Sequence, residues 1–252
     1  LTGQLIGAIG AGAIGAAAGW RTVLGVGAGL VGLALALTLV QLVPRAEVER
    51  PAFSLARIRD AYAQVFANPR ARICYTAVFV EGVCIIGILP YLSVLLERRG
   101  AGGVTEAGIV LAGLGSGGVL FTLLVPWLLR RLGGPMNLMR AGGAIAGAGL
   151  FCYALSPGVV TETLSFLVVG VGFYMLHNSL QTQATELAPG ARGAAVALHA
   201  SFFFAGQAAG PIVYRFGFAW LGTLAPILLA AAAMAALGFW TAARLSAKHR
   251  EP

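Results

Sequence analysis

Charge is scarce in this sequence. Asp, Glu, Lys and Arg together make up 10% of the 252 residues, whereas hydrophobic residues make up 58%. Soluble domains carry roughly 25% charged residues, so a soluble fold is excluded. Several uninterrupted apolar runs reach the length of about 18 residues that marks a candidate membrane-spanning helix. The composition therefore predicts an all-α polytopic membrane protein.

Cysteine and histidine are also rare, with three residues of each kind. Cys74, Cys84 and Cys152 fall within apolar runs and form no CxxC pair, which argues against a disulfide framework and against a zinc site. No P-loop pattern occurs, so an ATP-driven pump is not expected. Because the apolar runs contain no paired carboxylates, we expect no catalytic residues, no metal and no cofactor.

The formal net charge of +8 does not indicate nucleic-acid binding, because the basic residues flank the apolar runs. Lys and Arg are enriched in the cytoplasmic loops of membrane proteins. If Leu1 is cytoplasmic, thirteen of the 17 basic residues lie on that side, and Arg21, Arg98, Arg99 and Arg215 lie outside. We therefore expect a multi-pass protein of the plasma (inner) membrane with both termini in the cytoplasm.

About eight membrane spans are predicted. The expected ranges are 2–19, 22–43, 72–96, 105–129, 136–155, 162–184, 192–214 and 217–243. Most connections are short, which predicts that consecutive helices are antiparallel neighbours.

The polar segment 44–71 is the main break in the chain. Apolar residues recur within it at helical spacing, Ser54 is a possible N-cap, and Asn68-Pro69 is a stop signal. We expect a short amphipathic helix on the membrane surface. A disordered linker is the alternative.

Two segments that lie 203 residues apart are similar. GQLIGAIG begins at Gly3 and GQAAGPIV begins at Gly206, so that Gly3 and Gly7 align with Gly206 and Gly210. The two copies lie six spans apart, so the repeating unit contains six spans. A chain built from two such units has twelve spans. The expectation of eight spans here implies that four more precede them.

This pattern resembles the major facilitator superfamily, and more closely its drug:proton antiporters. In that family, two six-helix halves are related by an axis along the membrane normal. The resemblance implies that residues 1–43 are the last two helices of the N-terminal half, 44–71 the loop between the halves, and 72–252 the C-terminal half. The missing N-terminal helices of the same polypeptide are then expected partners, together with the lipid bilayer.

The first copy resembles the family's fifth-helix antiporter motif, G-x-x-x-G-P-x-x-G-G. Gly3, Gly7 and Gly12 match it, while Ala8 and Ala11 replace Pro and Gly. Such i, i+4 glycine pairs allow close helix contact in lipid. They fit helices that slide in a carrier, and they fit static packing equally.

The second copy keeps Gly206, Gly210 and Pro211 of the same motif. We expect both copies to pack closely against neighbouring helices. The stretch PWLLRRLGGPM resembles a further family motif, G-x-x-x-D-R-x-G-R-R. Arg130 stands where this motif has Asp. The charge latch that this Asp makes in the family is therefore in doubt.

Glu81 is the one acidic residue that the sequence places deep within a span. It follows Arg72 by nine residues, which puts it about 13–14 Å into the membrane. The ionised form of a carboxyl is disfavoured there. Glu81 can carry a proton or meet a cationic substrate, and the alternative is a protonated, hydrogen-bonded structural residue. Pro90 is expected to kink the same helix.

A second polar cluster occurs in YMLHNSLQTQ. Tyr174, His177 or Asn178, and Gln181 are spaced to share one helix face. His177 can relay a proton near neutral pH, and a structural histidine is the alternative. His199, closer to the cytoplasmic end, ranks lower.

Polar residues are unevenly distributed among the spans. The ranges 22–43, 136–155 and 217–243 have almost none away from their ends and are expected to face lipid. The other five are expected to surround a polar path, to which Gln207 also contributes.

These features favour a secondary active transporter that couples efflux of a small organic molecule to protons by alternating access. Glu81 is the expected coupling residue, and the His177 cluster is expected to bind substrate or relay protons. Two other classes stay open: a non-transporting truncated fragment or helix-packing partner, and an integral-membrane lipid-modifying enzyme.

Overall fold

The structure, a computed structural model, describes residues 2–41 and 54–247, and every regular element in these ranges is helical. The all-α class is thus confirmed. The elements are α1 (Thr2–Ala18), α2 (Trp20–Gln41), α3 (Leu55–Ala67), α4 (Arg70–Glu81), a π-helical turn (Gly82–Ile86), a 3-10 turn (Leu89–Tyr91), α5 (Leu92–Arg98), α6 (Val104–Leu132), α7 (Pro135–Ala154), α8 (Val159–Thr185), a 3-10 turn (Pro189–Ala191), α9 (Arg192–Leu221) and α10 (Leu224–Ala247).

Six helical stretches among the described residues are long and apolar enough to cross a membrane. They are Trp20–Gln41, Arg70–Arg98, Val104–Leu132, Val159–Thr185, Pro189–Leu221 and Leu224–Ala247. The apolar helix Ile6–Ala18 in α1 is shorter, and α7 is not among the six. Helices occupy all eight predicted positions, but the count of eight spans stays a prediction.

The predicted span 72–96 is helical without being one regular helix. After α4 ends at Glu81, the chain makes a π turn and then a 3-10 turn that contains Pro90. A proline ring clashes with the carbonyl four residues earlier, which here belongs to Ile86, the last residue of the π turn. The irregularity is thus not confined to Pro90 and begins at Gly82, directly after Glu81.

The predicted boundary between the last two spans is wrong. The connection was expected at residues 215–216, whereas α9 continues to Leu221 and the chain turns at Gly222, which has φ +72°. Glycine adopts this left-handed conformation without steric cost, and nothing at 215–216 interrupts the helix. Arg215 is consequently an exposed residue of α9 and not a loop residue.

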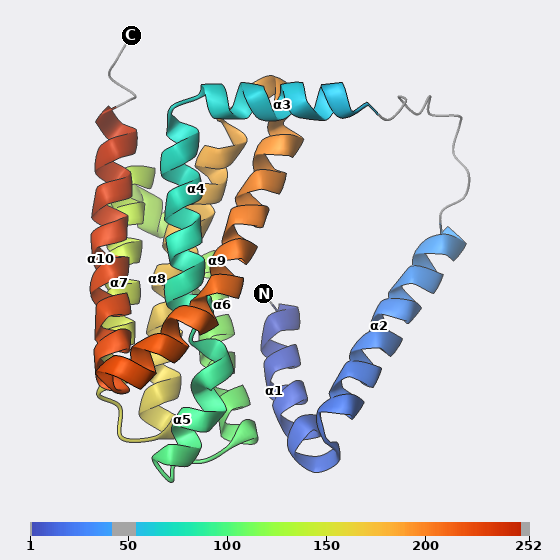
Figure 1. The fold of residues 1–252 in the computed structure, drawn as a ribbon, viewed down its shortest axis with the longest axis vertical. Coiled ribbons are helices and arrows are strands. Elements are labelled where there is room, and N and C mark those ends of the chain that lie inside the picture. The colour runs from blue at the N-terminus through green and yellow to red at the C-terminus, as the bar shows by residue number, and fades with distance from the viewer. Residues whose placement is uncertain (1, 42–53, 248–252) are drawn as a thin grey trace.

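The amphipathic helix expected within segment 44–71 is present as α3. Ser54 is its N-cap, with the side-chain oxygen 3.4 Å from the Arg57 nitrogen. The helix ends before Asn68, whose side-chain amide donates to the Leu187 carbonyl at 3.0 Å. α3 lies across one end of the bundle, where Val65 is fully buried (Figure 1). Residues 42–53 of this segment lie outside the described part of the chain.

Close helix contacts build the remaining bundle. α7 packs between α8 and α10, α6 contacts both α1 and α8, and α4 lies against α9. A Cβ atom added to Gly143 would lie 2.6 Å from the Met234 carbonyl oxygen, and one added to Gly147 would lie 2.6 Å from that of Ala231. Both distances are shorter than real Cβ contacts, so glycine is needed for this approach of α7 to α10.

The contacts of α1 differ from those expected. A Cβ added to Gly3 or Gly7 would meet nothing within 4 Å, so no described residue packs closely on this pair. α1 crosses α6 further along, where a Cβ on Gly12 would lie 3.2 Å from the Gly108 Cα. α2 has no buried residue in the described structure and leans away from the bundle (Figure 1).

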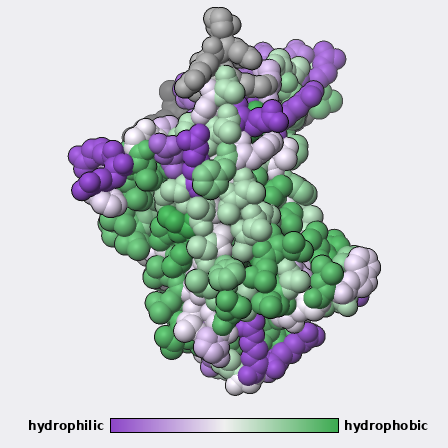
Figure 2. All heavy atoms as spheres, turned by 90° about the vertical axis from the view of Figure 1, so that its left-hand side faces the viewer, coloured by the Kyte–Doolittle hydropathy of each residue, from purple (hydrophilic) through white to green (hydrophobic). Residues whose placement is uncertain are grey.

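Hydrophilic surface gathers at the two ends of the molecule, with an apolar band between them (Figure 2). One end holds α3 and the start of α4, with Arg70 and Arg72. The other end holds the end of α5, with Arg98 and Arg99. This separation agrees with the expected division of the basic residues. Which end is cytoplasmic stays a prediction.

Candidate functional site

Two of the sequence-predicted residues, Glu81 and His177, are in direct contact. The His177 Nδ1 atom lies 2.8 Å from the Glu81 Oε2 atom, which joins α4 to α8. The Glu81 side chain is fully buried, and the His177 side chain is 17% exposed. A buried charge requires a partner, and here each group can offset the charge of the other. One proton can therefore be held by either group within the pair.

The π turn after Glu81 aligns the backbone of α4 with that of α9. A π turn bonds residues five apart, and the Gly87 nitrogen donates to the Gly82 carbonyl at 3.1 Å. Gly82 and Gly87 thus lie one above the other. A Cβ on Gly87 would lie 2.5 Å from the Gly210 Cα, and one on Gly82 would lie 3.2 Å from the Gly206 carbonyl carbon. These two contacts fix the backbone that directly follows Glu81 against α9.

Two tyrosines stabilise the irregular backbone beside Glu81. The Tyr214 hydroxyl donates to the Cys84 carbonyl at 2.7 Å, within the π turn. The Tyr91 hydroxyl donates to the Pro211 carbonyl at 2.7 Å. An unpaired backbone group in a membrane costs free energy, so the Tyr214 bond supports the π turn at this depth, and the Tyr91 bond ties the 3-10 turn to α9.

Aromatic rings and a second histidine surround His177. Its ring centroid lies 5.1 Å from that of Phe173, 4.8 Å from that of Phe203 and 5.3 Å from that of His199. His199 is 2% exposed, and neither of its ring nitrogens has a hydrogen-bond partner among the described residues. The sequence ranks His199 below His177 because it lies close to the cytoplasmic end of its span, and the sequence does not reveal that α9 brings it beside α8.

The other predicted polar residues lie around the pair. On α8, Tyr174 and Asn178 are half-buried and Gln181 is exposed. On α9, Gln207 is exposed and lines a hollow of about 350 Å³ together with Pro90 and its neighbours. The structure thus joins Glu81 to His177 directly, and the Gln207 backbone nitrogen would lie 3.0 Å from a Cβ on Gly82, the residue after Glu81.

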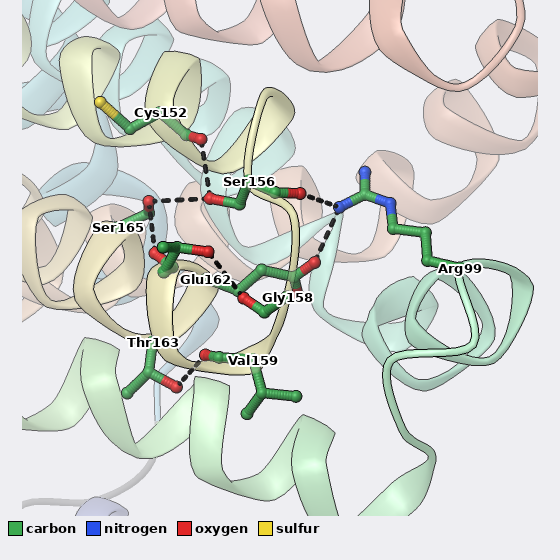
Figure 3. Close-up of polar contacts among 9 residues, drawn as sticks. Arg99, Cys152, Ser156, Gly158, Val159, Glu162, Thr163 and Ser165 are labelled. Carbon is green, nitrogen blue, oxygen red and sulfur yellow. Dashed lines mark hydrogen bonds and ion pairs between the residues drawn. The ribbon is translucent and has the colours of Figure 1, made fainter.

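A second buried polar cluster lies at the end of the bundle opposite α3. The Arg99 Nη1 atom donates to Glu162 Oε1 at 2.7 Å and to the Ser156 carbonyl at 3.3 Å (Figure 3). The Glu162 side chain is 1% exposed. This ion pair ties the end of α5 to the turn between α7 and α8. Sequence reasoning missed it, although a carboxyl at the first turn of an apolar run was an available signal.

Comparison with known proteins gives two matches. The family described as the Major Facilitator Superfamily matches residues 1–211. The chain is also similar to a Bacillus subtilis (strain 168) protein named "Uncharacterized MFS-type transporter YfkF", with 32% identity over 128 residues. That match covers 50% of this chain and 32% of the relative, or about a third of the relative's length.

Proposed function

The chain belongs to the Major Facilitator Superfamily, and we propose that it contributes to the proton-coupled export of a small organic molecule. Family membership points to membrane transport rather than to enzymatic catalysis. The coupling ion, the direction and the class of substrate are the proposed part.

The contact between Glu81 and His177 carries this proposal. When the pair holds one proton, the two groups are jointly neutral. When that proton leaves, a carboxylate remains in a fully buried position, where an unpaired charge is strongly disfavoured. The carboxylate then attracts either a new proton or a cationic substrate. Because the two compete for one group, release of substrate is linked to uptake of a proton.

The contact between α4 and α9 supports a conformational role for the same site. Glycines face each other at two levels of this contact, so at these levels no side chain stands between the two backbones. α4 carries Glu81, whereas His177 lies on α8. A shift of α4 along α9 therefore changes the contact within the pair, which alternating access requires.

We assign the substrate to the exposed surface of α8 and α9 next to the pair. Asn178 and Gln181 follow His177 on α8, and Gln207 and Phe204 lie on α9, where the Phe204 side chain is 61% exposed. Amides and an exposed aromatic ring suit an organic molecule with both polar and flat apolar parts. Tyr174, one turn before Asn178, extends the same surface.

In this proposal, residues 1–43 belong to the N-terminal half, 44–71 join the halves, and 72–252 form the C-terminal half. Further helices of the same polypeptide complete the substrate path, because family substrates bind between the two halves. The inner membrane is the proposed location, with both termini in the cytoplasm.

The test uses the full-length protein in liposomes, with the planar aromatic cation ethidium as the probe. Glu81→Gln keeps the size and hydrogen-bonding capacity of the side chain and removes its titratable proton. We expect exchange of ethidium at equal pH to stay within about twofold of the parent. Accumulation driven by a pH gradient should fall by about tenfold or more, the scale of a typical coupling free energy.

The matched control is Glu186→Gln, which removes an exposed carboxyl at the end of α8. This variant should exchange and accumulate ethidium like the parent. If Glu81→Gln also accumulates ethidium like the parent over the full pH range, then Glu81 is a structural residue and the proposed coupling is wrong.

A further inference from the structure

We propose that His199 is a third proton-carrying residue, which links the Glu81–His177 pair to the end of the bundle covered by α3. This inference rests on the proposed function, since a relay is useful only if the pair exchanges protons. Its basis is the position of His199 beside His177, its burial, and its two ring nitrogens, which have no hydrogen-bond partner within residues 2–41 and 54–247.

The environment of His199 differs from that of a structural histidine. A neutral imidazole has one donor nitrogen and one acceptor nitrogen. Both nitrogens of His199 are buried without a partner among the described residues, and such groups are normally satisfied by protein or by buried water. A histidine kept only for packing has a fixed partner or could be replaced by an apolar ring. The unpaired nitrogens point to exchange with water or with His177.

The spacing of the two imidazoles fits transfer between them. His177 uses Nδ1 to contact Glu81, which leaves Nε2 for another partner. The centroids of the His177 and His199 rings are 5.3 Å apart and their planes are inclined by 58°. A hydrogen bond, either direct or through one water, can bridge rings at this spacing. Phe203, with its centroid 4.8 Å from that of His177, shields the contact with an apolar ring.

The three residues are ordered by depth from the end that α3 covers. His199 follows the start of α9 by seven residues, His177 precedes the end of α8 by eight, and Glu81 follows the start of α4 by eleven. At 1.5 Å per residue, the depths are about 10, 12 and 16 Å. His199 is thus the member nearest to the α3 end, and His177 lies between it and Glu81.

No described group around His199 stabilises its charged form, so a proton that it takes up is held only transiently. No carboxylate forms an ion pair with it in the described part of the chain. On the α4 side, the Tyr75 hydroxyl donates to the Ala195 carbonyl at 3.0 Å, one turn before His199. Closer to α3, Arg70 is bonded to Gln183. The titratable group in ring contact with His199 is His177.

The transfer conserves protons at each step. Glu81 gives its carboxyl proton to Nδ1 of His177, so the O–H bond breaks and an N–H bond forms. At the same time Nε2 of His177 releases its proton, which breaks a second N–H bond. The released proton forms an N–H bond on His199, directly or through a bridging water. His199 then loses a proton to water at the α3 end, and Glu81 is left as a carboxylate.

The experiment follows Glu81 by time-resolved infrared spectroscopy of the full-length protein in nanodiscs. The carboxyl band of Glu81 is the band that is absent from Glu81→Gln. After a jump from about pH 8 to about pH 5, the range in which histidine changes charge, this band appears as Glu81 is protonated. In His199→Phe, which fills the site with a ring that carries no proton, its rate of appearance should fall by about tenfold or more. His249→Gln, which removes the third histidine, should match the parent.

The outcomes separate the relay from the proposed function. A His199→Phe rate within about twofold of the parent overturns the relay and leaves the pair intact. If the Glu81 band of His199→Phe is shifted but appears at the parent's rate, His199 only positions the pair, and the relay is again overturned. If the parent shows no Glu81 band change at all over this range, proton exchange by the pair itself is wrong. A slowed rate with an unshifted band supports the relay.

Discussion

Replacing Gly206 with alanine should push α4 and α9 apart beside the Glu81–His177 pair. A Cβ at this position would come within 2.9 Å of the Phe79 carbonyl carbon and closer still to its oxygen. Ordinary Cβ contacts begin at 3.4 Å, so the backbone of α4 has to move by about half an ångström or more. Both partners are helix backbone, and no flexible side chain can absorb the displacement.

Overpacking of this kind costs about 1–3 kcal/mol, whereas alanine gains about 1 kcal/mol of helix propensity over glycine. We therefore expect Gly206→Ala to lose up to about 2 kcal/mol of stability. Its melting temperature in detergent, followed by tryptophan fluorescence, should fall accordingly. The displacement should also weaken pH-driven transport, because Phe79 precedes Glu81 by two residues on α4.

The matched control is Gly193→Ala in the same helix, where an added Cβ would meet nothing within 4 Å. This variant should be as stable as the parent or slightly more stable, since only helix propensity changes. If Gly206→Ala melts at or above the temperature of Gly193→Ala, the glycine contact between α4 and α9 does not hold the two helices together.

Two further predictions concern the ends of the bundle. Arg99→Met should lower the free energy of unfolding by about 3 kcal/mol, the lower end of the range for a broken buried pair, because the Arg99 side chain is 25% exposed. Adding Glu162→Gln should restore part of this stability in thermal unfolding. A double variant that is no more stable than Arg99→Met would argue against the ion pair. With the native cysteines replaced, Ser54→Cys and Gly158→Cys should react with an impermeant maleimide from opposite sides of the membrane, and labelling from one shared side would rule out the proposed topology.

The helical part of the fold follows well from the sequence, because apolar runs and their flanking arginines are local signals. The helix at 55–67 is one example, since Ser54 and Asn68-Pro69 mark its two ends in the sequence. The end of α9 is a counterexample, because Arg215 suggested a loop whereas Gly222 makes the turn. A charged residue near a membrane surface can remain in a helix that extends beyond the lipid.

The candidate site was predictable as a set of residues but not as an arrangement. Glu81 and His177 stand out as polar residues in apolar runs, yet their contact depends on which faces α4 and α8 turn toward each other. The π turn adds a further change of direction directly after Glu81, and no local sequence rule places it there. The approach of His199 to His177 and of Glu162 to Arg99 likewise depends on tertiary packing.

The most direct test of the central claim, that Glu81 exchanges a proton for substrate, is to count the protons released when ethidium binds. Purified full-length protein in weakly buffered detergent is titrated with ethidium while a pH-sensitive dye reports proton release. The parent and Glu186→Gln should release about one proton per bound ethidium, and Glu81→Gln should release almost none, because linkage requires a group that changes its protonation on binding. Binding by the parent without proton release, or equal release by Glu81→Gln, would contradict the claim.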